Sequence, residues 1–178
     1  LWGRVADGRE TTMRTTAAVA STHLSAQTVW RALEKASFAV LGHVTPAGKP
    51  RTSGVMYAVH DRRIYMGVAD DGWKAQQIAT GDEVSVTVLV RLGGLLALVI
   101  PIPPATVTFR ARATMHRAGT SQAEQAPGEL LKRLPAATRD DMALIELVPE
   151  GDFVTYGIGV SLREFADPND APGRVGVT

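Results

Sequence analysis

The chain has 178 residues, 45% of them hydrophobic, which is typical of a single domain with a substantial core. Its 19 basic and 18 acidic side chains give a net charge of +1, too little to hold a nucleic-acid backbone or an anionic membrane surface without specific contacts. Cysteine is absent, which excludes disulfides and thiol chemistry and is consistent with a cytoplasmic location. We therefore expect neither a nucleic-acid partner nor a membrane partner.

The predicted elements start with an amphipathic helix over 26–36, for which Ser25 is a good N-cap. Three runs rich in β-branched and aromatic residues follow, over 37–45, 51–60 and 64–69, and turn residues separate them. This pattern predicts a three-stranded antiparallel meander. A short helix over 72–81, capped by Asp70 or Asp71, is predicted next.

A strand is predicted over 83–90, and a long alternating strand over 105–117 has one apolar and one polar face. A second exposed helix is predicted over 121–134, and two last strands over 142–149 and 152–160. The apolar segment 92–104 is too short to span a membrane, and it forms either a lid over a ligand or an arm at a dimer interface.

The sum is a mainly β (α+β) fold, in which six or seven antiparallel strands curl into a small barrel with two or three flanking helices. We expect a flexible N-terminal extension over 1–20, one domain over 21–165, and a flexible tail over 166–178 that is rich in Pro, Gly and Asn.

The sequence contains no motif for zinc, for a nucleophilic serine or for a nucleotide phosphate loop. Small and polar residues do gather at the ends of neighbouring predicted strands and at the start of the next helix: Arg51, Thr52, Ser53, Gly67, Ala69 and Lys74. A helix N-terminus beside a lysine and hydroxyl groups suits a phosphate monoester. The alternative is that these are solvated surface residues.

The stretch from Phe38 to Val90, above all IYMGVADDGWKAQQIATGDEVSVTVLV, resembles the flavin-binding half of the pyridoxamine 5′-phosphate oxidase family. This resemblance implies a split β-barrel homodimer with FMN sites at the subunit interface. It implies that Lys74 contacts the phosphate, that the second strand runs along the flavin with Gly67 and Val68 beside it, and that Thr106 reaches the cofactor from the other subunit. The cofactor-binding residues predicted in this way are Arg51, Thr52, Ser53, Gly54, Val55, Met56, Gly67, Val68, Trp73, Lys74 and Thr106.

The sequence departs from the family pattern at two of these positions. Ser53 stands where an arginine is usual, and Trp73 stands where arginine or serine is frequent. Arg51, on the same face of the strand as Ser53, can compensate for the missing charge. Trp73 either stacks on an aromatic ring or packs in the fold. The C-terminal arginine and histidine pattern that holds pyridoxamine phosphate is not seen, so we do not expect pyridoxal phosphate as the product.

The resemblance implies an FMN-dependent oxidoreductase that acts on a small molecule, for which no catalytic side chain is required because the flavin carries the hydride. One alternative is a reductase that uses the deazaflavin F420, whose acidic tail needs a basic groove. Arg62, Arg63, Arg110 and Arg112 are the candidates for that groove. The other alternative is a non-catalytic flavin- or haem-binding protein, in which His43, His60 or His116 ligates the iron. We expect no other metal site.

Overall fold

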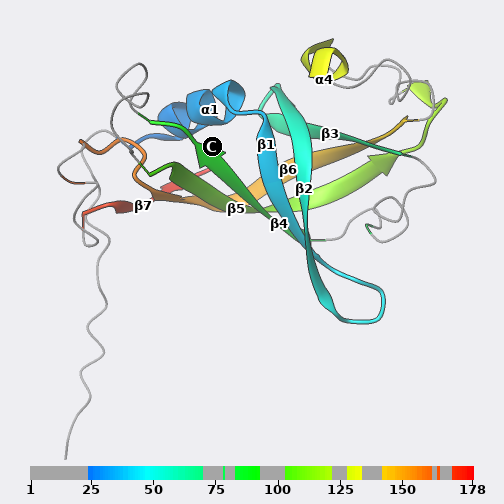
Figure 1. Cartoon of the computed structure of the whole chain (residues 1–178), viewed down its shortest axis with the longest axis horizontal. Coiled ribbons are helices and arrows are strands. Elements are labelled where there is room, and N and C mark those ends of the chain that lie inside the picture. The colour runs from blue at the N-terminus through cyan, green and yellow to red at the C-terminus, as the bar shows by residue number, and fades with distance from the viewer. Residues whose placement is uncertain are drawn as a thin grey trace, which may run out of the picture.

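The computed structural model describes residues 24–69, 78, 83–92, 103–121, 128–133, 142–161, 164 and 170–178. In this part of the chain, helices α1 (Ala26–Lys35) and α4 (Gly128–Arg133) flank one antiparallel sheet (Figure 1). The strands of the sheet are β1 (Phe38–Val44), β2 (Pro50–His60), β3 (Arg63–Ala69), β4 (Glu83–Val90), β5 (Ala105–His116), β6 (Met142–Tyr156) and β7 (Pro172–Gly176).

The strand order is β3-β2-β1-β4-β5-β6-β7, and a further pairing of β3 with β6 closes the first six strands into a barrel. Strand β7 pairs with β6 and lies outside the closed ring. This architecture confirms the mainly β, six- to seven-stranded antiparallel barrel. It also confirms the predicted meander, since β2 pairs with both β1 and β3.

The tight turn between β2 and β3 consists of Asp61 and Arg62, whose φ angles are 48° and 57°. Positive φ at both central residues is the geometry that matches the twist of a two-residue hairpin. Because His60 pairs directly with Arg63, the turn fixes the register of both strands. The longer β1–β2 hairpin projects from the barrel away from the two helices (Figure 1).

The core fills the barrel because alternate strand residues point inward. On β5, Val107, Phe109, Ala111 and Ala113 are buried while the residues between them face outward, as the sequence predicts. Helix α1 adds Val29, Trp30 and Leu33 to the same core. The rings of Trp30 and Phe109 both meet Phe153 edge to face, at 5.3 and 5.4 Å between centroids.

Helix α1 begins where it was predicted, because the Ser25 side chain accepts a hydrogen bond from the Thr28 amide at 3.2 Å. Its end is tied to the barrel by the Tyr57 hydroxyl, which donates to the Leu33 carbonyl at 2.7 Å. This carbonyl belongs to the last turn, where helix carbonyls lack partners in the helix itself.

The C-terminal part differs from the expectation in two ways. The two predicted last strands are one continuous strand, β6, which bends at Gly151 (φ 74°) close to a register shift between Thr108 and Arg110 of β5. The tail expected to be flexible contains β7, and its Val177 carbonyl accepts a hydrogen bond from Trp30 Nε1 at 3.0 Å. The sheet therefore extends beyond the boundary expected at residue 165.

Of the predicted helix over 121–134, the structure describes α4, whose Leu130 is fully buried against Ala58, Met142 and Leu144. The predicted N-terminal extension, the helix over 72–81 (apart from Ile78, which is buried) and most of the apolar segment 92–104 lie outside the described residues. None of the described helices combines the length and the apolar character that a membrane span requires.

Candidate functional site

The predicted cofactor residues 51–56 form the first half of β2, and the pleat divides them between two faces. Thr52, Gly54 and Met56 are exposed on the outer face. Val55, only 5% exposed, points into the core. Ser53 lies on the same inner face as Val55, opposite Leu41 of β1. A ligand along this strand would therefore meet side chains of the outer face and only the backbone at Val55.

Ser53 carries a buried polar atom that fits a ligand. Its Oγ is shielded from solvent, and no hydrogen-bond partner for it exists among the described residues. A buried hydroxyl without a partner costs about 1–3 kcal/mol, so such groups mark places where a ligand or water completes the hydrogen bonding. A phosphate or ribityl oxygen would reach this hydroxyl only from the inner side of the sheet, on which Ser53 and Arg51 lie, so the fit to a phosphate-bearing cofactor rests on these two side chains rather than on Thr52 and Gly54.

An aromatic side chain that was not predicted lies at Gly54, in the cofactor strip formed by residues 51–56 of β2. A Cβ atom built on Gly54 would lie 2.6 Å from Phe38 Cζ, which shows that the Phe38 ring lies directly over the glycine. Phe38 is nonetheless 50% exposed, and its partner across the β1–β2 ladder is Met56. The outer face beside the predicted strip is therefore apolar.

The other predicted residues lie on separate strands. On β3, Val68 is 8% exposed and belongs to the core, while Gly67 pairs with Leu144 of β6. Thr106 lies on the outer face of β5, and β1 and β4 separate it from β2. Three strand spacings amount to about 14 Å, so Thr106 does not adjoin the β2 strip within one chain. Trp73 and Lys74 lie outside the described residues.

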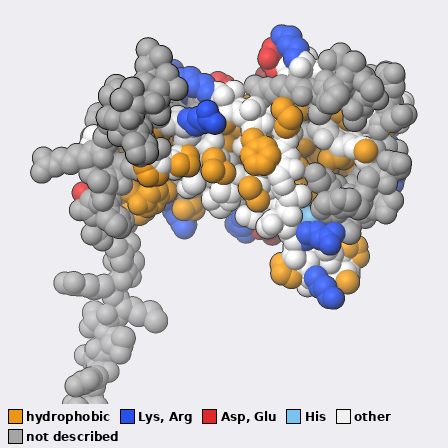
Figure 2. Space-filling view, in the orientation of Figure 1, with side chains coloured by type: hydrophobic (Ala, Val, Ile, Leu, Met, Phe, Trp, Pro, Cys, Tyr) orange, Lys and Arg blue, Asp and Glu red, His pale blue; other side chains and the backbone are white. Residues whose placement is uncertain are grey.

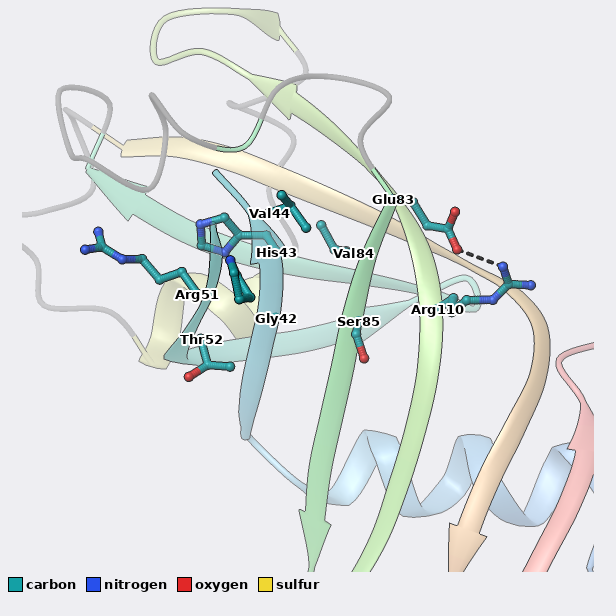
Figure 3. A pocket seen from close by; sticks show the side chains of 10 residues that line it. Gly42, His43, Val44, Arg51, Thr52, Glu83, Val84, Ser85 and Arg110 are labelled. Carbon is teal, nitrogen blue, oxygen red and sulfur yellow. Dashed lines mark hydrogen bonds and ion pairs between the residues drawn. The ribbon is translucent and has the colours of Figure 1, made fainter. Parts of the chain in front are cut away.

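A cavity of about 620 Å³ opens at the end of β1 and β2 (Figure 3). It contains two of the predicted residues, Arg51 and Thr52, and extends away from β2 across β1 to β4 and β5. Its full lining is Gly42, His43, Val44, Pro50, Arg51, Thr52, Glu83, Val84, Ser85 and Arg110.

Strand register explains why these residues meet. Thr52 pairs with Gly42, Gly42 with Ser85, and Ser85 with Arg110, so the four form one row across β2, β1, β4 and β5. His43 pairs with Arg51 next to this row and is 6% exposed. Sequence reasoning missed Gly42 and Ser85 as site residues, and it considered Arg110 only for the basic groove of the F420 alternative. Only a glycine inside a predicted strand could have pointed to this position, since it marks a close approach.

The four arginines considered for a basic groove do not gather into one. Arg110 pairs with Glu83 at 2.8 Å, Arg112 with Glu150 at 2.9 Å, and Arg63 with Glu146. Arg62 lies in the β2–β3 turn. The outer face that carries β5 and the first half of β6 is thus balanced in charge rather than basic.

Glu146 lies at the centre of a second polar cluster, on the seam where β3 and β6 close the barrel. Its carboxylate accepts a hydrogen bond from Arg63 and lies 2.9 Å from His116 Nε2. Burial by itself raises the pKa of Glu146, but the hydrogen bonds and the positive charges of its two partners outweigh it, so the pKa lies below 4.5. Burial also raises the pKa of Tyr65, and the charge of Glu146 adds to that effect.

The histidines are dispersed. His60 is exposed next to Asp61 in the turn, His116 is engaged with Glu146, and His43 lines the cavity. Among the residues that the structure describes, no three His, Cys, Asp or Glu side chains lie close enough together to hold a metal ion.

Comparison with solved structures finds the same fold in proteins of different functions. The heme storage protein HutZ from Vibrio cholerae has a TM-score of 0.57 and 17% identity, over 74% of this chain and 94% of HutZ. The FAD binding protein from Mycobacterium smegmatis has a TM-score of 0.54 and 17% identity, over 71% and 90% of the two chains. An F420 reductase has a TM-score of 0.52 and 18% identity, over 69% and 93%.

No protein-family model matches the sequence, and no curated protein sequence matches it. The likeness to solved structures is therefore one of architecture, with each of the three compared proteins covered over nine-tenths or more of its length. The chain has a split β-barrel fold, which it shares with a heme storage protein, an FAD binding protein and an F420 reductase.

Proposed function

We propose that this protein binds a flavin-type cofactor, FMN in the first instance, and acts as an oxidoreductase on a small molecule. The observation that carries the proposal is the coincidence of two features. The fold is shared with an FAD binding protein and an F420 reductase. The strand predicted to hold the cofactor carries the buried hydroxyl of Ser53, which has no hydrogen-bond partner among the described residues, next to Arg51 and Thr52 of the cavity lining.

The residues of the strip have distinct roles in this proposal. Arg51, Thr52 and Ser53 hold the phosphate and the ribityl chain together with Lys74. Gly67 lets the ring approach the backbone closely, whereas Gly54 is covered by the Phe38 ring, which is the surface that the flavin would meet there. The bound flavin supplies hydride transfer, while the protein supplies orientation and exclusion of water. The sites stay predictions until ligand binding is measured.

The proposal includes a homodimer, because large apolar side chains are exposed on the outer face. They include Phe38 (50% exposed), Met56 (41%), Leu89 (44%) and Tyr156 (37%). Phe38 pairs with Met56, while Thr106 pairs with both Leu89 and Tyr156, so the patch crosses five strands. The space-filling view also shows hydrophobic side chains in a band across the middle of the molecule (Figure 2). Such a patch suits burial against a second subunit.

A dimer would also account for the position of Thr106. This residue lies inside the apolar patch and far from β2 of its own chain, so in the proposal the partner subunit's Thr106 approaches the cofactor. The substitution Leu89→Asp should yield a monomer by analytical ultracentrifugation and weaken FMN binding. Val148→Asp is the control, since Val148 is similarly exposed (38%) but lies on β6 beside Arg112.

Different observations favour each of the two alternative cofactors, F420 and haem. F420 is favoured by the structural likeness to an F420 reductase, but the paired arginines of β5 offer little charge to its acidic tail. Haem is favoured by the likeness to HutZ and by His43, which lines the cavity. A cytoplasmic location stays a prediction.

Titration of the full-length protein with FMN, F420 and haem tests the proposal, with flavin fluorescence and haem absorption as readouts. We expect saturable FMN binding at one site per subunit, weakened at least tenfold by Lys74→Ala. Haem binding that His43→Ala abolishes, in the absence of flavin binding, would replace the proposal with the haem alternative. Absence of binding by all three ligands would refute it.

Ser53→Ala is the sharper variant, because the proposal requires opposite effects on two measurements. Without ligand, removing an unsatisfied buried hydroxyl should leave the stability unchanged or higher. With FMN, the affinity should fall about fivefold or more, since a hydrogen bond to the ligand is lost. Thr155→Val removes the other buried hydroxyl that has no partner among the described residues, and it should change stability alone. Equal FMN affinities for all three proteins would remove Ser53 from the site.

A further inference from the structure

We propose that the cavity above Gly42 binds an organic anion, a small molecule that carries a carboxylate or phosphate on an apolar body. The anion would be the substrate of the proposed oxidoreductase. Only its role as a substrate rests on the proposed function, because the anion site itself does not depend on it. It concerns Gly42, Ser85 and Arg110, which lie beyond the predicted cofactor strip.

The cavity has its floor at Gly42, in the middle of a four-strand row of polar residues. A Cβ at this position would meet only ordinary contacts, 3.6 Å to the Ser85 carbonyl and 4.0 Å to Thr52 Cγ2. The backbone there is not strained, so glycine is not needed for its φ angle. Glycine weakens a strand interior, and its presence marks space in front of the sheet. The hydroxyl groups of Thr52 and Ser85 stand on either side of that space (Figure 3).

Positive charge lies on both sides of the floor. Arg51 and Arg110 line the cavity from strands on opposite sides of β1. Arg110 belongs to the row of Gly42, Arg51 alternates with Thr52, and in Figure 3 both side chains extend away from Gly42 in opposite directions. Glu83 is the acidic residue of the lining, so two arginines and one glutamate leave one net positive charge. Long arginine stems with exposed heads reorient readily, and each guanidinium offers five donors for an acidic group.

The ion pair of Arg110 with Glu83 does not prevent anion binding. Its two side chains are 67% and 58% exposed, and pairs of this kind contribute at most about 1 kcal/mol. A ligand carboxylate can therefore share Arg110 with Glu83, or displace Glu83 from Arg110, at little cost. Val44, Pro50 and Val84 also line the cavity, and they favour an anion with an apolar body over a bare inorganic ion.

Residue-resolved NMR of the ¹⁵N-labelled full chain tests the proposal, with benzoate and inorganic phosphate as probes at constant ionic strength. We expect saturable shifts of the Gly42, Thr52 and Ser85 amides, with tighter binding of benzoate. Arg110→Gln should weaken benzoate binding about tenfold, because a charge-assisted hydrogen bond is lost. Gly42→Leu should abolish the binding by filling the space, and Gly42→Ala should have an intermediate effect.

Arg112→Gln is the matched control. Arg112 lies on the same face of β5, is similarly exposed (58%) and has its own carboxylate partner, Glu150, but it does not line the cavity. We expect it to leave benzoate binding unchanged. Equal losses of benzoate binding in the two arginine variants would show a general charge effect and overturn the site. The site would also be overturned if the wild-type protein showed no shifts, or shifts spread over its whole surface.

Flavin titrations of the same variants show where the anion comes from. If it is the cofactor's own tail, Arg110→Gln weakens FMN or F420 but not riboflavin, which lacks the phosphate. If the anion belongs to a separate substrate, Arg110→Gln leaves the affinities for FMN, F420 and riboflavin unchanged and weakens only benzoate binding. Both results support the anion site. A protein that binds benzoate at Gly42 but no flavin would refute the proposed function alone, whereas flavin binding without a benzoate site would refute this inference alone.

Discussion

Replacement of Glu146 by glutamine tests the polar cluster that fastens the barrel where β3 meets β6. The carboxylate of Glu146 is only 13% exposed and accepts hydrogen bonds from Arg63 on β3 and His116 on β5. A buried hydrogen bond to a charged group contributes about 1.5–3 kcal/mol. Arg63 is 51% exposed, which reduces its share. We expect Glu146→Gln to lower the free energy of unfolding by about 2 kcal/mol at pH 7.

The sign of the pH dependence follows from the lowered pKa of Glu146. Because the pKa is lower in the folded protein than in the unfolded chain, ionised Glu146 stabilises the fold above about pH 4.5, and this contribution is lost as the pH falls through the folded pKa. Glutamine does not titrate. The stability difference between wild type and Glu146→Gln should therefore shrink between pH 5 and pH 3.

Urea denaturation at pH 7, 5 and 3.5, at one fixed protein concentration, measures both effects. Glu150→Gln on the same strand is the control, since the Arg112–Glu150 pair is 58% and 40% exposed and should contribute less than about 1 kcal/mol. A stability loss in Glu146→Gln no larger than that in Glu150→Gln, or one equal at pH 3.5 and pH 7, would show that the Glu146 carboxylate does not stabilise the closed barrel.

Three further substitutions have definite expected outcomes. Tyr57→Phe removes the hydroxyl that donates to the Leu33 carbonyl, and urea denaturation should show a loss of about 1–2 kcal/mol; no loss would mean that this bond is idle. Trp30→Phe keeps an aromatic ring but loses the bond to the Val177 carbonyl, so amide hydrogen exchange in β7 should accelerate about fivefold, and unchanged exchange would contradict the anchoring role. Arg62→Gly removes the side chain from a residue with a φ of 57°, so the free energy of unfolding should rise by about 0.5 kcal/mol and the thermal midpoint slightly with it. A lower midpoint would show that the turn is not strained.

Strands with strong local patterns were predictable from the sequence. Alternation over 105–117 predicted the two faces of β5, which the structure confirms. The strand predicted over 83–90 is β4, and both strands agree with the prediction to within one residue at the ends. Strand β7 was not predictable, because its five residues include a proline and two glycines. What makes it a strand is pairing with β6, such as Thr155 with Gly173, and no local window of sequence contains that information.

The candidate site was partly predictable for the same reason. Arg51, Thr52 and Ser53 are neighbours in the chain, so their chemistry stands out in the sequence. Gly42 and Arg110 become part of the same cavity only through the registers of β1, β4 and β5. The resemblance also did not show which of the predicted residues face a ligand. The pleat of β2 turns the Val55 side chain into the core, while Gly54 and Met56 face outward.

The pairing of β3 with β6 has a consequence for how the chain folds during synthesis. Ile64 pairs with Leu147, so the ring closes only after the ribosome has delivered nearly the whole domain. Until then β3 and β5 each present an unpaired edge, and exposed edges recruit other strands. Closure through contacts so distant in sequence is slow, which lengthens this vulnerable interval. Truncation before β6 should therefore yield an aggregating chain rather than a smaller barrel.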